Sequence, residues 1–153
     1  MIERFKRALT IAVQDLYDND YSLIERGGME QACVSRIYYY LQTLINNDAE
    51  LQHFHLDCEY NKNGEKAKWC TDVDTGEKFQ TRPDMVLHRR TNNNNNKVVI
   101  EFKGWWNNNH EPDKRKLKAF TCQNSIYRYE LGIFVKLGMH EPKYSFFRNA
   151  TPT

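Results

Sequence analysis

Two short stretches of the sequence decide the expected fold: PDMVL at residues 83–87 and VVIEFK at residues 98–103. Each contains a run of apolar residues typical of a buried strand. They also carry three ionisable residues, Asp84, Glu101 and Lys103. Burying an unpaired charge is so unfavourable that such groups are normally paired with one another or with a metal ion. The two stretches therefore predict neighbouring strands whose charged ends neutralise one another or form a site.

The spacing of these residues predicts where the three side chains meet. Side chains alternate between the two faces of a strand, so Glu101 and Lys103 share one face and Phe102 points into apolar packing on the other. The interval between Asp84 and Glu101 accommodates a strand, a polar hairpin and a second strand. In a hairpin the start of one strand lies beside the end of the next. We therefore expect Asp84, Glu101 and Lys103 to converge at one end of a sheet.

Two carboxylates and a lysine at one place have a specific chemical use. Mg²⁺ prefers a few carboxylates together with waters and substrate phosphate oxygens. Asp84, Glu101 and the backbone carbonyl of Phe102 would meet that need, with Mn²⁺ as a substitute for Mg²⁺. A bound metal stabilises charge on a phosphate and lowers the pKa of a bound water, and Lys103 would position that water or stabilise developing negative charge. The alternative is a Glu101–Lys103 surface pair on an edge strand beside a Pro-Asp turn.

The rest of the chain predicts the elements around these strands. Apolar residues at helical spacing indicate helices over residues 2–16 and about 29–44, and Pro112 in an acidic first turn favours a third helix from Glu111 to about Asn124. Strands are expected at residues 53–60, 66–72, 79–90, 97–103, 129–137 and 143–148, with turns at residues 61–64 and 91–96. The sequence thus predicts an α/β fold (an α+β mixed sheet) in the order α-α-β-β-β-α-β(-β), with four to five central strands flanked by helices. Residues 1–150 would form one domain and residues 151–153 a tail.

Composition limits the class of protein. The chain has 153 residues, of which 40% are hydrophobic and 27% charged, as is usual for one soluble globular domain. No apolar run approaches the roughly 18 residues of a membrane span, and the N-terminal residues lack the apolar core of a signal peptide. Four widely spaced cysteines without a CxxC pair are expected to be reduced thiols. We therefore expect a cytoplasmic protein with no membrane association.

Charge alone does not indicate a nucleic-acid binder, because the net charge is only +2. Basic residues nevertheless bracket the two strands, and they would hold backbone phosphates if they are not simply a solvated face. The residues of this kind are Arg89, Lys114, Arg115, Lys116 and Lys118. Trp105 and Trp106 follow the second strand and would stack on bases, or else close the core or a dimer contact. Three consecutive tyrosines at residues 38–40 favour a homodimer.

The two motifs in this order resemble those of the PD-(D/E)XK nuclease superfamily, which has the restriction-endonuclease-like fold. The match lies in residues 82–87 and 98–103, and the similar order of elements covers about residues 29–137. The resemblance implies magnesium-dependent cleavage, mostly of DNA, on a core shared with restriction enzymes, junction resolvases, repair nucleases and mobile-element proteins. Bulky Phe102 departs from the small or aliphatic residue found there in many active members.

The resemblance also implies further site residues. An acid on the helix before the sheet would be Glu30, with Glu25 as the alternative, although either could simply favour a helix start. A polar residue on the helix after the second motif would be Asp113, Lys116 or Gln123. The remaining metal-type residues, His53, His55, Cys58 and Cys70, match no common zinc spacing and are expected to be core or surface residues.

The expected function is that of a metal-dependent endonuclease, a phosphodiester hydrolase that acts on DNA. A non-catalytic nucleic-acid- or protein-binding module on the same fold is the alternative. A third hypothesis is a toxin, defence or mobile-element component whose nuclease activity is controlled by a partner.

Overall fold

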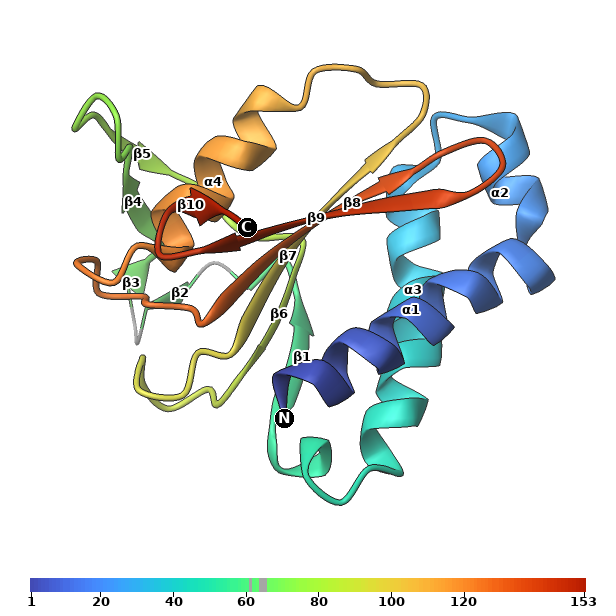
Figure 1. Ribbon diagram of the computed structural model, residues 1–153, viewed down its shortest axis with the longest axis horizontal. Coiled ribbons are helices and arrows are strands. Elements are labelled where there is room, and N and C mark those ends of the chain that lie inside the picture. The colour runs from blue at the N-terminus through green and yellow to red at the C-terminus, as the bar shows by residue number, and fades with distance from the viewer. Residues whose placement is uncertain (61, 64–65) are drawn as a thin grey trace.

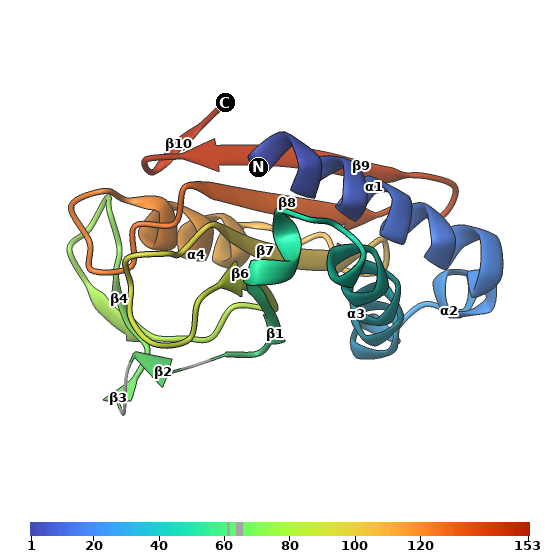
Figure 2. The ribbon, with the colours of Figure 1, turned by 90° about the horizontal axis from the view of Figure 1, so that it is seen from below.

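A six-stranded mixed sheet forms the centre of the protein. The structure is a computed structural model that describes residues 1–60, 62–63 and 66–153. The strand order is β1-β6-β7-β8-β9-β10, and β7 and β8 are parallel whereas the other neighbours are antiparallel. Figure 2 shows β1 and β10 at opposite edges of this sheet. The strands are β1 (His55–Cys58), β6 (Met85–His88), β7 (Val98–Gly104), β8 (Leu131–Leu137), β9 (Pro142–Arg148) and β10 (Thr151–Pro152).

Helices cover both faces of the sheet. Those in the described part of the chain are α1 (Ile2–Asn19), α2 (Tyr21–Arg26), α3 (Glu30–Asn46) and α4 (Glu111–Thr121). α1, α2 and α3 lie together on one side of the sheet and α4 on the other, as Figure 1 shows. Because α4 connects β7 to β8, it provides the crossover that a parallel pair requires. The fold is therefore mixed α/β.

The burial of β7 follows from this layering. Phe102 has no exposed surface and belongs to the apolar cluster between the sheet and the helices α1 and α3. Val99 points to the other face and packs with Leu117 of α4. Strands covered on both faces are apolar nearly throughout, and the sequence of β7 and of β8 is of this kind. Glu101 and Lys103 are therefore the two charged residues in an otherwise apolar strand.

The break between α2 and α3 supports the end of β7. Gly27 and Gly28 have φ angles of +71° and +74°, which residues with a Cβ rarely adopt. The ring of Trp105 packs against Gly27, and its Nε1 donates a hydrogen bond to the carbonyl oxygen of Ile24 at 2.8 Å. The segment after β7 is thereby tied to the helical layer.

Several predicted boundaries are corrected by the structure. The strand expected at residues 79–90 is two strands, because β5 (Lys78–Gln80) pairs with β4 (Trp69–Thr71) in a separate ribbon and only β6 joins the main sheet. Pro83, which lies between them, has no N–H to offer a strand ladder. The strand expected at residues 53–60 is shorter, because Leu51–His53 form a turn of 3₁₀ helix before β1. Helix α4 ends at Thr121 rather than near Asn124, and α2 was not predicted.

The remaining differences concern the meander and the C-terminus. The strand expected at residues 66–72 is divided between β3 (Lys66–Ala67), which pairs with β2 (Lys62–Asn63), and β4. The turn expected at residues 61–64 lies partly outside the described residues. Residues 151–153 are not a free tail, because Thr151 and Pro152 pair with β9 and the Thr153 amide donates to the Phe146 carbonyl at 2.9 Å. The main sheet therefore has six strands rather than four to five.

Within the described ranges, no helix is both long enough and apolar enough to cross a membrane.

Candidate active site

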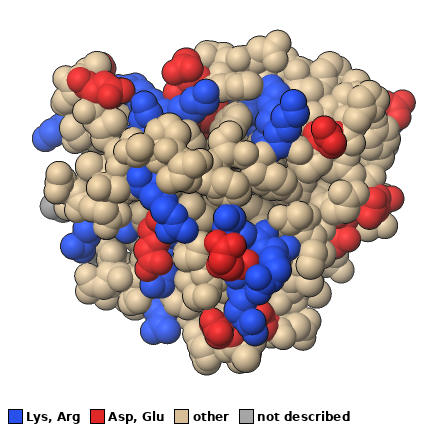
Figure 3. Space-filling model, viewed as in Figure 1, with Lys and Arg blue, Asp and Glu red and all other residues tan. Residues whose placement is uncertain are grey.

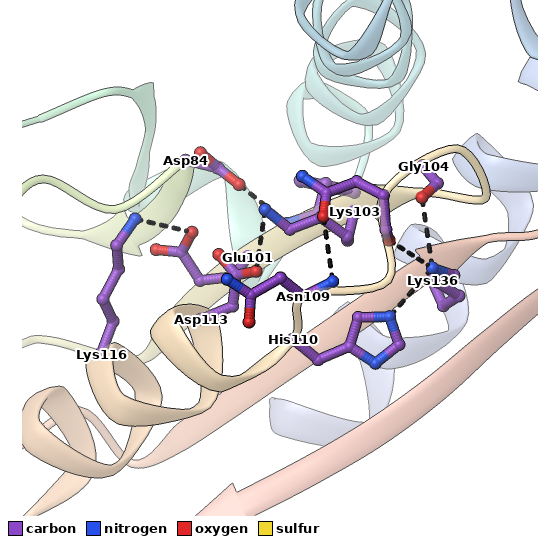
Figure 4. Close-up of polar contacts among 11 residues, drawn as sticks. Asp84, Glu101, Lys103, Gly104, Asn109, His110, Asp113, Lys116 and Lys136 are labelled. Atoms are coloured by element: carbon purple, nitrogen blue, oxygen red, sulfur yellow. Dashed lines mark hydrogen bonds and ion pairs between the residues drawn. The ribbon is translucent and has the colours of Figure 1, made fainter. Parts of the chain in front are cut away.

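Asp84 and Glu101 lie side by side at one end of the sheet. The antiparallel register pairs Met85 with Ile100, which places Asp84 beside Glu101 just beyond the last paired residues. The Asp84 Oδ2 atom accepts a hydrogen bond of 2.8 Å from the Phe102 amide (Figure 4). The predicted convergence of Asp84 and Glu101 is therefore confirmed. A backbone amide fixes the position of the Asp84 carboxylate.

Glu101 is fully buried and has too few hydrogen-bond donors. Lys116 of α4 places its Nζ atom 3.3 Å from Oε2. No donor in the described part of the chain reaches Oε1. Burial, and then the neighbouring Asp84 charge, raise the pKa of Glu101 well above its ordinary value. The pKa of Asp84 is also raised by burial, although the Phe102 amide acts in the opposite direction.

These two carboxyl groups therefore need a further positive partner. Two ionised carboxylates have only acceptor atoms to offer each other. A shared proton or a bound cation would satisfy both groups. This is the electrostatic signature of a cation site, as well as of a proton-sharing acid pair.

Lys103 lies on the same face of β7 as Glu101 and is held by an acid from α4. Its Nζ atom lies 3.0 Å from Oδ2 of Asp113, a buried residue in the first turn of that helix. Figure 4 shows Lys116 and Asp113 extending from α4 toward these two residues of β7. Of the three predicted polar positions on this helix, Asp113 and Lys116 reach the site. The third, Gln123, bonds to the carbonyls of Thr121 and Tyr129 instead.

Lys136 is a further site residue that the sequence analysis missed. The parallel register places it beside Lys103. Its Nζ donates to the carbonyl oxygens of Gly104 at 3.2 Å and Asn107 at 2.8 Å, and to Nε2 of His110 at 2.9 Å. Burial and the Lys136 charge lower the pKa of His110, in agreement with a neutral, accepting ring. Lys136 thus holds the loop that leads from Lys103 to Asp113. The one feature of the sequence that could have indicated this role is the presence of a lysine within an otherwise apolar strand.

Glu30 lies near this site without completing a three-ligand set. It stands in the first turn of α3 and lines, with Asp84, a cavity of about 410 Å³. Burial raises the pKa of Glu30, whereas the Lys103 charge lowers it. The alternative acid, Glu25, is exposed on α2. Among the residues that the structure describes, no three His, Cys, Asp or Glu side chains form a metal-binding group.

This donor set fits magnesium better than zinc. Mg²⁺ keeps several waters and uses one or two carboxylates, which Asp84 and Glu101 supply. The buried Oε1 of Glu101, which has no donor, offers a ligand atom. A structural zinc site would need four protein ligands, and His53, His55, Cys58 and Cys70 do not gather into one within the described residues.

The basic cluster on α4 is largely neutralised within the chain. Arg115 lies 2.6 Å from Asp72 and stacks on the Phe79 ring at 3.9 Å, and Lys118 lies 3.7 Å from Asp74. Lys114 has no ion-pair partner among the described residues and lines a cavity of about 460 Å³. Figure 3 shows basic side chains in small groups beside acidic ones on the face viewed, rather than one extended basic surface.

The remaining predicted nucleic-acid contacts are placed elsewhere. Arg89 follows the last residue of β6, so it lies at the opposite end of that strand from Asp84, and it stacks over the Phe54 ring at 5.1 Å. Trp105 and Trp106 are partly buried and pack against the apolar core. The Trp106 ring occupies the space that a Cβ atom at residue 104 would need, so this position requires glycine. In this structure both tryptophans close the core, which is the alternative expected for them.

No protein-family model, no curated protein and no solved structure matches this chain at a significant level.

Proposed function

We propose that this protein is a metal-dependent nuclease of the PD-(D/E)XK type with a restriction-endonuclease-like core. The observation that carries the proposal is the adjacent pair of half-buried Asp84 and fully buried Glu101, whose pKa values are both raised, with Lys103 two residues along the same strand face. Strongly perturbed ionisable groups at one place favour a functional site over a structural ion cluster.

The order of elements supports the same proposal. Helix α3 is followed by β1, β6 and β7 as antiparallel neighbours, then by α4 and the parallel strand β8. Helix, three strands, helix and strand is the order expected for that core. The ribbons β2–β3 and β4–β5 are then an insertion between its first two strands.

Each site residue has a role in phosphodiester hydrolysis. Asp84, Glu101 and the Phe102 carbonyl would hold Mg²⁺, and Glu30 lines the same cavity as Asp84. The metal would stabilise charge on the scissile phosphate and lower the pKa of a bound water. Lys103, oriented by Asp113, would position that water or donate to a phosphate oxygen. Lys136 keeps Asp113 in place through the loop at residues 105–110.

Charge around the site favours one direction of approach for the substrate. The cavity on the α3 side is lined by three acids, Glu30, Glu59 and Asp84. The cavity on the α4 side also has three acids, Asp72, Asp74 and Glu111, but these are balanced by the basic residues Lys114, Arg115 and Lys118. The phosphate chain of a DNA substrate would therefore approach along α4 and leave the acidic side to the cation.

The proposal is tested by cleavage of plasmid and oligonucleotide DNA with Mg²⁺ or Mn²⁺. We expect Asp84→Asn and Lys103→Met to lower the cleavage rate by about 100-fold or more, because each removes a group acting on metal or water. Lys143→Met is the matched control, since Lys143 is exposed on β9. Equal cleavage rates in the wild type, Asp84→Asn and Lys103→Met would contradict the proposal.

A non-catalytic nucleic-acid-binding module on the same fold is the second candidate. The observation in its favour is that Lys116 already pairs with Glu101 and Asp113 with Lys103, so the chain compensates part of the charge itself. This candidate predicts oligonucleotide binding that persists in EDTA, with no cleavage and no heat of Mn²⁺ binding in calorimetry.

A further inference from the structure

The β4–β5 ribbon has one face packed on the protein and one face open. Trp69 pairs with Gln80 and Thr71 with Lys78, and all four side chains are exposed. Cys70 and Phe79, which alternate with them, face inward, and Cys70 is 4% exposed. Because side chains alternate along a strand, the four outward residues form one continuous surface.

This open face borders a hollow with two exposed apolar side chains. A cavity of about 300 Å³ is lined by Trp69 and Lys78 from the ribbon and by Asn124, Ser125 and Ile126 from the segment after α4. Trp69 is 54% exposed and Ile126 55%. A single exposed apolar residue is ordinary, whereas two at one hollow with polar groups around it favour a binding surface.

The backbone of Trp69 is held by two hydrogen bonds to one side chain. The Tyr127 hydroxyl accepts a hydrogen bond from the Trp69 amide at 2.9 Å and donates one to the Trp69 carbonyl at 2.7 Å. Tyr127 itself is buried and packs edge-on against Phe120 at 5.3 Å between ring centroids. A ring presented from a fixed backbone loses little freedom when a ligand stacks on it.

The inward face of the β4–β5 ribbon packs on the helix that carries part of the candidate active site. Cys70, the neighbour of Trp69, packs in one cluster with Leu117 of α4 and Val99 of β7. Figure 1 shows β4 and β5 beside α4. The same helix carries Asp113 and Lys116, and Ala119 in its last turn lines the hollow beside Trp69, so a nucleic-acid strand that runs along α4 would contact both places.

We propose that Trp69 and Lys78 form a subsite for an unpaired nucleotide, with the base stacked on the indole ring and its phosphate on the ammonium group. The choice of nucleic acid rests on the proposed nuclease function. Lys78 has no ion-pair partner among the described residues, Asn124 lines the same hollow, and Gln80 stands beside Trp69 on the open face. Bases within a duplex are already stacked on one another, so Trp69 selects substrates with a single-stranded segment beside the scissile bond.

The test is binding of a labelled single-stranded oligonucleotide in EDTA, measured by fluorescence anisotropy. Stacking on an aromatic side chain contributes about 1–3 kcal/mol per base, so Trp69→Ala should weaken binding by about 5- to 150-fold. Trp69→Phe should restore most of the affinity. Tyr39→Ala is the matched control, because Tyr39 is an aromatic residue, 58% exposed, on α3.

Two further measurements distinguish stacking of a base on Trp69 and a phosphate contact at Lys78 from an indirect effect of the substitutions on binding. Trp105 and Trp106 are partly buried, so quenching of tryptophan fluorescence on binding should be lost in Trp69→Phe. Lys78→Ala should lower the slope of log affinity against log salt by about 0.7, the value for one phosphate contact to a single strand.

The subsite is overturned if the wild type does not bind single strands in EDTA, if Trp69→Ala binds as tightly as the wild type, or if Tyr39→Ala weakens binding equally. EDTA prevents metal-dependent cleavage, so the result is separate from the proposed activity. Binding that needs Trp69, without cleavage in Mg²⁺, would refute the nuclease alone. Cleavage with unchanged binding by Trp69→Ala would refute the subsite alone.

Discussion

Two acids beside strand β6 are in opposite electrostatic conditions: Asp84 precedes the first residue of the strand, and Asp57, which pairs with Val86, extends its carboxylate toward the His88 end. At the His88 end, Asp57 of the neighbouring strand β1 accepts hydrogen bonds from His88 Nε2 at 2.7 Å and from Arg90 at 2.7 and 3.0 Å. Burial would raise the pKa of Asp57, but these bonds from His88 and Arg90 hold it far below its usual range. This acid is fully satisfied by the chain.

At the Asp84 end, two acids share too few donors. Burial raises the pKa of both Asp84 and Glu101, and Oε1 of Glu101 has no donor in the described part of the chain. The comparison shows that the number of hydrogen-bond donors, as well as burial, decides the direction in which the pKa of each acid is shifted. We therefore propose that Asp57 contributes to stability and that Asp84 and Glu101 form the functional site.

The largest effect on stability is expected from replacing Asp57, whose carboxylate has all its hydrogen-bond donors within the chain. Asp57→Ala removes three hydrogen bonds and leaves His88, which is 2% exposed, without its acidic partner. Loss of such a partner should lower the free energy of unfolding by about 2–3 kcal/mol. Urea unfolding followed by circular dichroism measures this change. A loss under about 0.5 kcal/mol, the scale of a neutral surface substitution, would refute the structural assignment.

A smaller change of opposite sign is expected at the other end. Glu101→Gln replaces a fully buried carboxylate by a neutral group of the same shape, and Lys116 retains access to solvent. Removing an undercompensated buried charge should raise the free energy of unfolding by about 1–2 kcal/mol in EDTA. The same urea experiment applies. A large destabilisation would show that Glu101 is a structural acid like Asp57.

The two ends should also respond to pH with opposite signs. The folded pKa of Glu101 lies above its ordinary value of 4.5, so its penalty is present at neutral pH and is relieved as the pH falls toward 4.5. The folded pKa of Asp57 lies below its ordinary value of 3.8, so its contribution is present above 3.8 and is lost as the pH falls through the folded pKa. Stability curves of the wild type and Glu101→Gln should therefore converge on acidification, and parallel curves would contradict this account.

The sequence could predict the central motif because its determinants are local. Strand alternation fixed the shared face of Glu101 and Lys103, and hairpin geometry brought Asp84 to Glu101. The apolar runs of β7 and β8 identified both strands to within about two residues. Their charged positions are conspicuous because the surrounding residues are apolar on both faces.

Other parts depend on contacts that no local pattern encodes. The pairing of Lys136 with the loop after β7 requires the parallel register of two strands separated by a helix. Arg89 was assigned to the site from its closeness in sequence to Asp84, but a strand separates them in space. The ion pairs of Arg115 depend on a ribbon whose separation from the main sheet was not expected.

The most direct test of the central claim is calorimetric titration of Mn²⁺ into the wild type, Glu101→Gln and Asp57→Asn. Mn²⁺ is a suitable probe because it accepts the same oxygen ligands as Mg²⁺. We predict that the wild type and Asp57→Asn bind the ion and that Glu101→Gln does not. Mn²⁺ binding by Glu101→Gln equal to that of the wild type, or loss of binding in Asp57→Asn alone, would contradict the assignment of the Asp84–Glu101 end as the cation site.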